Sequence, residues 1–234
     1  MRQYGELLFQ VTRLGLVNVQ LLREDDGLSL IDTGLPGMAP IILRAAGRIG
    51  LPIRRILLTH AHMDHLGSLD ALHAALPDAE VLISARDARF VRGDMSLDPE
   101  EPQRPLKGAY VQPKTVPTRL LQDGDRIGSL RAVATPGHTP GHLAFQDTRD
   151  GAVLAGDALQ SRAGGLRVCF DSAPLFPLVA QGSWAPDLAL QSARRLLDLN
   201  PSRLALGHGP VLEAPRALLE RATAHAEARL RHRA

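Results

Sequence analysis

The segment 59–65, with the sequence THAHMDH, constrains the fold of this chain more than any other part of it. It follows an apolar run, Arg55–Thr59, that predicts a short strand. On a helix, residues two apart point about 200° away from each other, so His60 and His62 could share a metal ion only from a loop. Three histidines and an aspartate this close together favour a metal-binding loop over a functionless polar loop.

Composition and charge exclude several classes of function. Of the 234 residues, 44% are hydrophobic and 22% charged, which predicts a single globular domain spanning residues 1–234. The 27 basic and 25 acidic side chains leave a net charge of +2, so we expect no nucleic-acid or membrane partner. Cys169 is the only cysteine, which excludes an internal disulfide and a cysteine-based zinc site. No apolar run approaches the roughly 18 residues of a membrane helix, and no signal peptide is recognisable, so we expect a cytoplasmic protein.

Apolar runs and turn signals predict alternating strands and helices along most of the chain. In the first half, the predicted strands are Glu6–Val11, Val17–Leu22, Leu28–Ile31, Arg55–Thr59 and Glu80–Ile83, and the predicted helices are Ala39–Ile49, Ser68–Leu76 and Ala85–Val91. In the second half, the predicted strands are Arg126–Ala134, Leu143–Gln146, Val153–Ala155 and Arg203–Leu206, and the predicted helices are Asp187–Leu199 and Pro215–Arg231. The segments Gly93–Pro117 and Gln160–Ser183 are predicted to be irregular. This alternation predicts a layered α/β domain.

Three further residues of metal-ligand type each follow a predicted strand. His138 lies in the sequence TPGHTPGH, Asp157 follows Leu154-Ala155-Gly156, and His208 lies between two glycines. Glycines beside these residues let the backbone approach a ligand closely. The sequence therefore predicts that more than one loop contributes metal ligands.

This set of residues resembles the ligand set of the metallo-β-lactamase superfamily. The matching positions, in order, are His60, His62, Asp64, His65, His138, Asp157 and His208. The turn Asp32-Thr33-Gly34 also resembles the Asp-x-Gly turn that precedes the metal loop in this family, so the match spans residues 18–209. The resemblance implies an αββα four-layer sandwich, in which two mixed sheets pack face to face and the metals lie at one edge.

The resemblance also implies two divalent metal ions. Zinc is the expected metal, and iron and manganese are the alternatives. It assigns His60, His62 and His138 to one ion, Asp64, His65 and His208 to the other, and Asp157 to a bridge between them. A hydroxide bridging the ions would be the nucleophile, since metal binding lowers the pKa of water from about 15.7 toward about 7. Asp64 is either a plain ligand or a proton shuttle to the leaving group. Asp32 is expected to orient a ligand histidine without binding metal.

Structural roles are expected for the other histidines and for the cysteine. His142 is expected to be a buried, hydrogen-bonded residue, because the ligand set is already complete without it. His73 is expected to be structural or exposed, and His225 and His232 to be solvated on a basic terminal helix. Cys169 is expected to be an inert packed thiol, with a place in the substrate pocket as the alternative.

Aromatic side chains are scarce, yet Phe170, Phe176 and Trp184 lie close together in the sequence after Asp157. They form either an apolar wall for the substrate or anchors that fix a long loop, and the sequence leaves both interpretations open. Tyr110 and Lys107 lie in the proline-rich segment and are further candidates to close over a substrate.

The function that follows from the resemblance is hydrolysis of a small carboxylic ester, lactone or thioester. An acyl-homoserine lactonase and a hydroxyacylglutathione hydrolase-like thioesterase are the specific alternatives. Alternatives of other classes are a mononuclear iron persulfide dioxygenase and a binding protein stabilised by metal. We expect a small-molecule substrate, and a homodimer is one of the assembly states left open.

Overall fold

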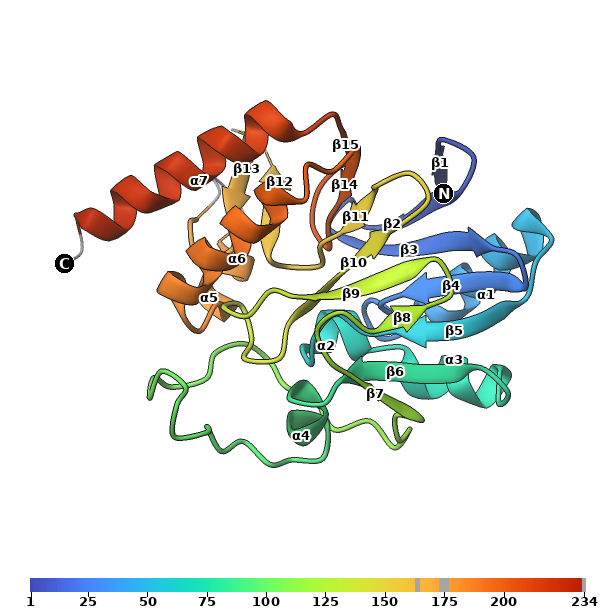
Figure 1. Cartoon of the computed structure of the whole chain (residues 1–234). Helices are drawn as coiled ribbons and strands as arrows, with labels where there is room; N and C mark the ends of the chain where they lie inside the picture. Colours follow the sequence, from blue (N-terminus) through green and yellow to red (C-terminus); the bar gives the residue numbers. More distant parts are fainter. Residues whose placement is uncertain (163–164, 173–176, 233–234) are drawn as a thin grey trace. The chain divides into compact units, whose positions relative to one another are not determined.

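The computed structural model in Figure 1 divides the chain into two units, each built on its own β-sheet. It describes residues 1–162, 165–172 and 177–232. Unit 1 consists of Met1–Asp94 and Tyr110–Leu121, and unit 2 consists of Met95–Ala109 and Gln122–Ala234. The chain therefore leaves unit 1 and returns to it within the proline-rich segment 93–117, which contains no helix and no strand, as predicted.

Unit 1 is a seven-stranded mixed sheet whose strand order follows the sequence. The strands are β1 Arg2–Tyr4, β2 Leu8–Arg13, β3 Val17–Glu24, β4 Gly27–Ile31, β5 Ile53–Leu57, β6 Glu80–Ser84 and β7 Arg119–Leu121. Strands β1 to β4 pair antiparallel, and β4 to β7 pair parallel. The helices are α1 Ala39–Ile49, α2 Met63–Leu66, α3 Leu69–Ala75 and α4 Asp87–Val91.

Local sequence determines where helix α1 begins and ends. Pro40 occupies the first turn, where a missing N–H costs nothing. Ala39, Ile42 and Ala46 recur at helical spacing and are buried. Gly50 ends the helix with a φ of +79° and donates its N–H to the Ala46 carbonyl. The bounds of this helix were predicted correctly because a proline and a glycine mark its two ends.

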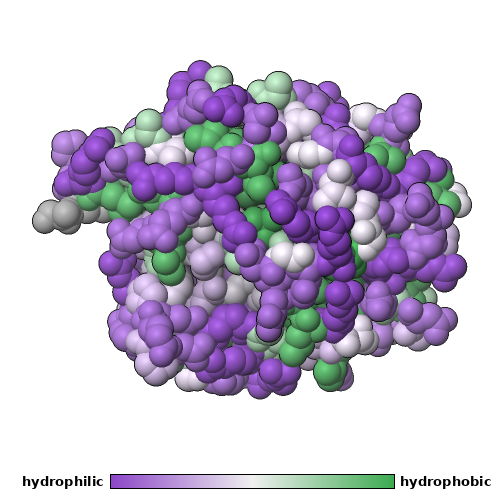
Figure 2. Space-filling view, in the orientation of Figure 1, coloured by the Kyte–Doolittle hydropathy of each residue, from purple (hydrophilic) through white to green (hydrophobic). Residues whose placement is uncertain are grey.

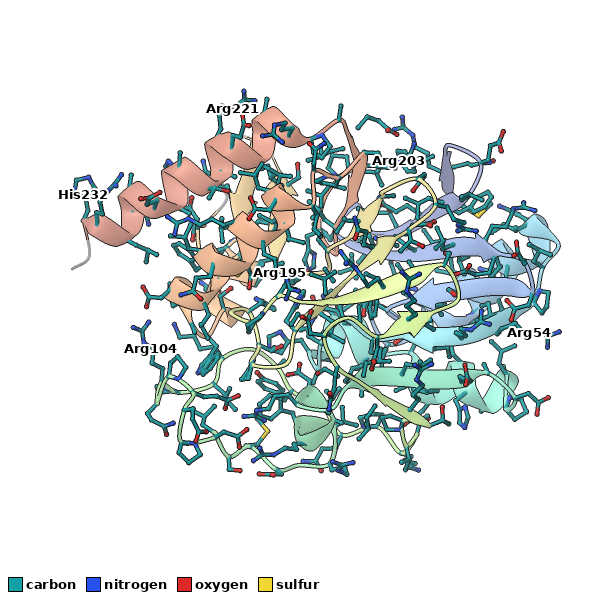
Figure 3. The ribbon with its side chains drawn as sticks, viewed as in Figure 1. Arg54, Arg104, Arg195, Arg203, Arg221 and His232 are labelled. Atoms are coloured by element: carbon teal, nitrogen blue, oxygen red, sulfur yellow. The ribbon has the colours of Figure 1, made fainter. Side chains whose placement is uncertain are left out.

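Unit 2 has a six-stranded mixed sheet and a separate hairpin. The sheet order is β15 Leu212–Glu213, β14 Arg203–Ala205, β11 Val153–Leu154, β10 Leu143–Asp147, β9 Leu130–Ala134 and β8 Arg126–Ile127. The hairpin is β12 Leu159–Arg162 with β13 Gly165–Val168, and the helices are α5 Leu178–Gly182, α6 Pro186–Asp198 and α7 Arg216–Arg231. Arg195 of α6, labelled in Figure 3, bonds the Ala134 carbonyl at 3.0 Å and thereby ties α6 to the end of β9.

Strand direction decides where the candidate ligands emerge. In unit 1, β4 and β5 run parallel, so the residues after both strands lie at the same edge of the sheet. In unit 2, β11 and β14 run parallel, and β9 shares their direction because both β9 and β11 pair antiparallel with β10. The segments that carry His138, Asp157 and His208 therefore leave that sheet at one edge.

Three predictions about elements were wrong. The segment Arg126–Ala134 is two strands, β8 and β9, because Gly128 with a φ of +57° makes a turn between them. The segment Gln160–Ser183 is not irregular throughout, because it contains most of β12, all of β13 and α5. The predicted strand Arg55–Thr59 instead spans Ile53–Leu57, which leaves Thr59 in the following loop.

None of the helices in the described ranges combines the length and apolarity needed to cross a bilayer. The face of the molecule shown in Figure 2 is mostly hydrophilic, with hydrophobic residues in separate groups.

Candidate metal centre

One buried carboxylate holds the loop that follows β5. Asp32 lies directly after β4, and it is 1% exposed. It accepts hydrogen bonds from the Thr59 backbone N–H and the Thr59 hydroxyl, both at 2.8 Å. Its backbone φ is +61°, a left-handed conformation that aspartate tolerates better than most residues. The parallel pairing of β4 with β5 thus brings Asp32 to the start of the histidine loop.

Hydrogen bonds fix two histidine rings of this loop. The Asp32 carboxylate lies 2.7 Å from Nδ1 of His65, and because a carboxylate only accepts, Nδ1 carries the proton. The Thr59 hydroxyl gives its single proton to Asp32, so it accepts from Nδ1 of His60 at 3.0 Å. Both rings therefore keep the lone pair of Nε2 for a metal ion.

The four candidate ligands of unit 1 divide between a loop and a short helix. His60 and His62 lie in the loop, as predicted, whereas Asp64 and His65 lie on α2, which the sequence did not predict. A ring nitrogen of His60 lies within 4.8 Å of one from His62 and of one from His65, and a carboxylate oxygen of Asp64 lies within the same distance of a His65 nitrogen. The three histidines are buried, and the Asp64 side chain is 32% exposed.

Two further contacts fix the backbone of this segment. The Thr33 N–H and hydroxyl both donate to the His65 carbonyl, at 2.7 and 2.9 Å. Asp87, at the start of α4, accepts the Ala61 N–H at 3.1 Å. The segment 59–65, which follows β5, is therefore hydrogen-bonded to the residues that follow the two strands beside β5, namely β4 and β6.

In unit 2, three candidate ligands converge on one carboxylate oxygen. Asp157 Oδ2 lies 3.5 Å from Nε2 of His138 and 3.2 Å from Nε2 of His208. All three side chains are almost fully buried. Nitrogen and oxygen atoms at this spacing are close enough to serve as metal ligands, because zinc binds each of them at about 2.0–2.2 Å.

His142 has the structural role that was predicted. It is 1% exposed, and its Nε2 accepts the Asp157 backbone N–H at 3.1 Å. Its Nδ1 must therefore carry the proton and donate to the Thr135 hydroxyl at 2.8 Å. With both nitrogens engaged, His142 supports Asp157 and has no lone pair left for a metal.

The donor set of each unit fits divalent metal ions. The histidines His60, His65 and His138 each have Nδ1 bonded to an oxygen of the protein, which is the arrangement that orients a metal-binding imidazole. Buried carboxylates and neutral imidazoles without cysteine suit zinc, iron or manganese. Thr59 and Ser183, the oxygen partners of His60 and His138, were not recognised from the sequence.

The predicted pocket residues have different surroundings. Trp184 is 1% exposed and its indole N–H donates to the Arg104 carbonyl at 3.0 Å, which supports the anchor interpretation. Phe170 is also buried. Tyr110 packs edge-on against His62 with ring centroids 4.7 Å apart, and burial raises the pKa of its buried phenol. Phe176 lies outside the described residues.

The remaining singled-out residues have structural surroundings. Burial raises the pKa of the Cys169 thiol to about 12, so the thiol stays protonated and inert at neutral pH. His225 is exposed on α7, as expected, and its Nε2 also lies 3.0 Å from the buried carboxylate of Asp171. His73 is half-buried, and Lys107 and His232 are exposed.

Comparison with known proteins shows relatives along most of the chain. The model of the metallo-β-lactamase superfamily matches residues 12–208. The uncharacterized protein YobT of Bacillus subtilis is 47% identical over 200 residues, 85% of each chain. The probable metallo-hydrolase YflN of the same organism is 29% identical, covering 82% of this chain and 78% of YflN. Hydroxyacylglutathione hydrolase of Rhodospirillum rubrum is 32% identical over 54% of this chain but only 41% of that protein. The crystal structure of TTHA1623 in a di-iron-bound form matches with a TM-score of 0.66 and 28% identity, covering 89% of this chain and 96% of that one.

The fold and the buried His/Asp clusters thus define a metallo-hydrolase. The chain belongs to the metallo-β-lactamase superfamily, since the family model matches far more than half of it. The predicted family and its fold, with two mixed sheets and flanking helices, are confirmed.

Proposed function

We propose that this metallo-hydrolase is binuclear and cleaves a small carboxylic ester, lactone or thioester. Two divalent ions would be held by His60, His62, Asp64, His65, His138, Asp157 and His208. Zinc is the first candidate for both ions. The observation that carries the proposal is the convergence of two Nε2 atoms on Asp157 Oδ2, because this arrangement would let Asp157 serve as a ligand shared by two ions, with His138 and His208 on different ions. The di-iron form of TTHA1623 supports two ions in a site of this family.

When bound, two such ions supply an acidified water and a cation that polarises a carbonyl oxygen. The residues of the chain then orient the ligands and move protons. Asp32 holds the His65 ring through Nδ1, and His142 holds the backbone of Asp157. Asp64 is the most exposed member of the set, so it is the side chain best able to pass a proton to a leaving group.

The substrate class rests on what these groups can do without a side-chain nucleophile. Hydrolysis of an acyl group needs a nucleophilic water, a stabilised oxyanion and a protonated leaving group. The similarity to hydroxyacylglutathione hydrolase supports a thioester, and an acyl-homoserine lactone is the second specific candidate. Persulfide oxidation at a single iron is the competing reaction of another class.

The decisive test combines metal analysis with a substrate panel. Purified protein is analysed for metal content and assayed on acyl lactones, thioesters, activated carboxylic esters, β-lactams and bis-p-nitrophenyl phosphate. We expect two metal ions per chain and faster cleavage of lactones, thioesters or esters than of the phosphodiester. One iron per chain with oxygen consumption on a persulfide would replace the proposal, and so would a phosphodiesterase rate about tenfold above every acyl substrate.

A matched pair of variants controls for burial. Asp157 and Asp147 are both buried aspartates of unit 2, but Asp147 bonds Arg149 instead of facing histidines. We expect Asp157→Asn to lose metal and activity, whereas Asp147→Asn should keep two ions per chain. An Asp157→Asn protein with both metals and full activity would contradict the bridging assignment.

We also propose a cytoplasmic enzyme with a small-molecule substrate and without a nucleic-acid or membrane partner. The net charge of +2 supports the absence of strong attraction to polyanions. Sedimentation of the purified protein with DNA and with anionic vesicles tests this, and light scattering distinguishes a monomer from a homodimer.

A further inference from the structure

The segment between α5 and α6, residues 183–185, is hydrogen-bonded to the loop that carries His138. The Trp184 backbone N–H lies 3.1 Å from the carbonyls of both Gly137 and His138, and the Ala185 N–H donates to the Gly137 carbonyl at 2.8 Å. The Trp184 indole reaches in another direction, to the carbonyl of Arg104, which is labelled in Figure 3. This segment is therefore fixed at the point where it meets the candidate ligand.

Ser183 makes the contact with the His138 side chain itself. Its Oγ lies 2.9 Å from Nδ1 of His138 and 2.8 Å from the Val179 carbonyl, and the serine is 2% exposed. A carbonyl can only accept, so the single hydroxyl proton goes to Val179. The hydroxyl must then accept the proton of Nδ1, which leaves the lone pair on Nε2 of His138, the nitrogen that faces Asp157.

We propose that Ser183 is a positioning residue that holds the His138 ring in the tautomer and orientation required of a metal ligand. The proposal rests on the proposed function for the role of His138. Ser183 acts as Thr59 does for His60, through a neutral hydroxyl that itself donates to a second acceptor. The ring is thereby oriented without a further negative charge beside it, unlike His65 with Asp32.

The chain offers a matched control for this contact. Ser192 of α6 is also buried and also bonds the His138 loop, but its hydroxyl donates to the Pro136 carbonyl at 2.7 Å and not to the imidazole. A merely structural role for Ser183 predicts that Ser183→Ala and Ser192→Ala behave alike. Ser183→Thr keeps the hydroxyl, and threonine suits the extended backbone at this position, whose φ is −84° and ψ is 131°.

The test measures tautomer and metal affinity separately. In metal-free protein, long-range ¹H–¹⁵N spectra report whether Nδ1 or Nε2 of His138 carries the proton, and in the loaded protein chelator competition gives the dissociation constant for zinc. We expect Ser183→Ala to lose the single Nδ1–H tautomer and to bind zinc about 10–100-fold more weakly. Ser192→Ala should keep the tautomer and most of the affinity, and Ser183→Thr should restore both.

Two results would overturn the proposal. One is a Ser183→Ala protein that keeps the Nδ1–H tautomer and the wild-type zinc affinity. The other is a Ser192→Ala protein that weakens zinc binding as much as Ser183→Ala does. If the wild-type protein binds no metal, the proposed function fails, and the metal-free spectra alone then decide whether Ser183 sets the tautomer.

Discussion

At the scale of single residues, burial does not separate ligand histidines from structural ones. His60 and His142 are 0% and 1% exposed, and each gives its Nδ1 proton to a threonine hydroxyl. They differ at Nε2, which in His142 accepts the Asp157 N–H. The partner of the second nitrogen therefore distinguishes the two roles, and this partner is visible only in the folded chain.

Replacing these two histidines should change different properties of the protein. His60→Ala should lose bound metal, measured by elemental analysis. His142→Ala should keep metal but lower the free energy of unfolding in urea by about 1–3 kcal/mol, because the buried Asp157 N–H loses its acceptor. Loss of a metal ion from His142→Ala would show that the ligand assignment is wrong.

Asp32→Asn tests the charge that orients His65. Asparagine tolerates the left-handed φ of +61°, so the backbone should survive. The amide has only one oxygen, whereas the two oxygens of Asp32 both accept hydrogen bonds from Thr59 and one of them also accepts from His65. We expect zinc affinity to fall about 10–100-fold in chelator competition. Asp26→Asn, at an exposed ion pair with Arg55, is the control that should leave affinity unchanged.

At the scale of elements, the first turn of α6 packs directly on the His138 loop. A Cβ at Gly137 would overlap the backbone of Ala189 in α6, and its φ is +138°. Gly124 also has a positive φ, +86°, but a Cβ there meets nothing within 4 Å. The two glycines therefore separate backbone strain from a steric clash.

Gly137→Ala should lower the melting temperature much more than Gly124→Ala and should also reduce metal content, because α6 or the His138 loop must move. Gly124→Ala should cost only the strain of the left-handed backbone, about 1 kcal/mol. Equal losses in the two variants, measured by calorimetry and elemental analysis, would mean that α6 does not hold the loop.

The proline-rich segment is attached to α3 by one carboxylate. Asp70 accepts hydrogen bonds from the Lys114 N–H at 3.0 Å and from the N–H and hydroxyl of Thr115 at 2.8 and 2.7 Å. Burial raises the pKa of Asp70, but these hydrogen bonds outweigh burial and hold the pKa below its ordinary value.

A carboxyl with a lowered pKa stabilises the fold above its unfolded pKa, and this contribution is lost as the pH falls through the folded pKa. Wild type should therefore be more stable than Asp70→Asn at pH 7, and the difference should shrink as the pH falls below about 4. Urea unfolding of both proteins from pH 7 to pH 3 measures it, and a constant difference would mean that the charge of Asp70 contributes nothing.

At the scale of the whole molecule, the sequence predicted the family fold and the long elements better than the short ones. Helix α1 is bounded by local signals, but β7 and β15 have three and two residues and become strands only through pairing with β6 and β14. Such short runs carry no periodic pattern. Ser183 was missed for a similar reason, since it lies 45 residues from His138 and only the fold brings them together.

Metal should stabilise the whole chain, because an ion that binds only the folded state shifts the unfolding equilibrium. At a free metal concentration 100 times the dissociation constant, the gain is about 2.7 kcal/mol. Chelation should lower the melting temperature by several degrees, and zinc should restore it. Asp157→Asn should show a much smaller response, and a wild-type melting temperature indifferent to chelator would count against a resident metal.

The order of strands in unit 1 allows its sheet to form strand by strand during translation. Each strand from β2 to β7 pairs with the strand synthesised just before it, and β7 ends at Leu121. A ribosome that has released the first half of the chain has therefore delivered every strand of that sheet, and each could add to its predecessor during translation. In unit 2, β11 pairs with β10, which precedes it in the sequence, but its other neighbour, β14, begins only at Arg203. The second sheet is therefore completed only after β14 has been translated, and the Asp157 and His208 segments come together only then.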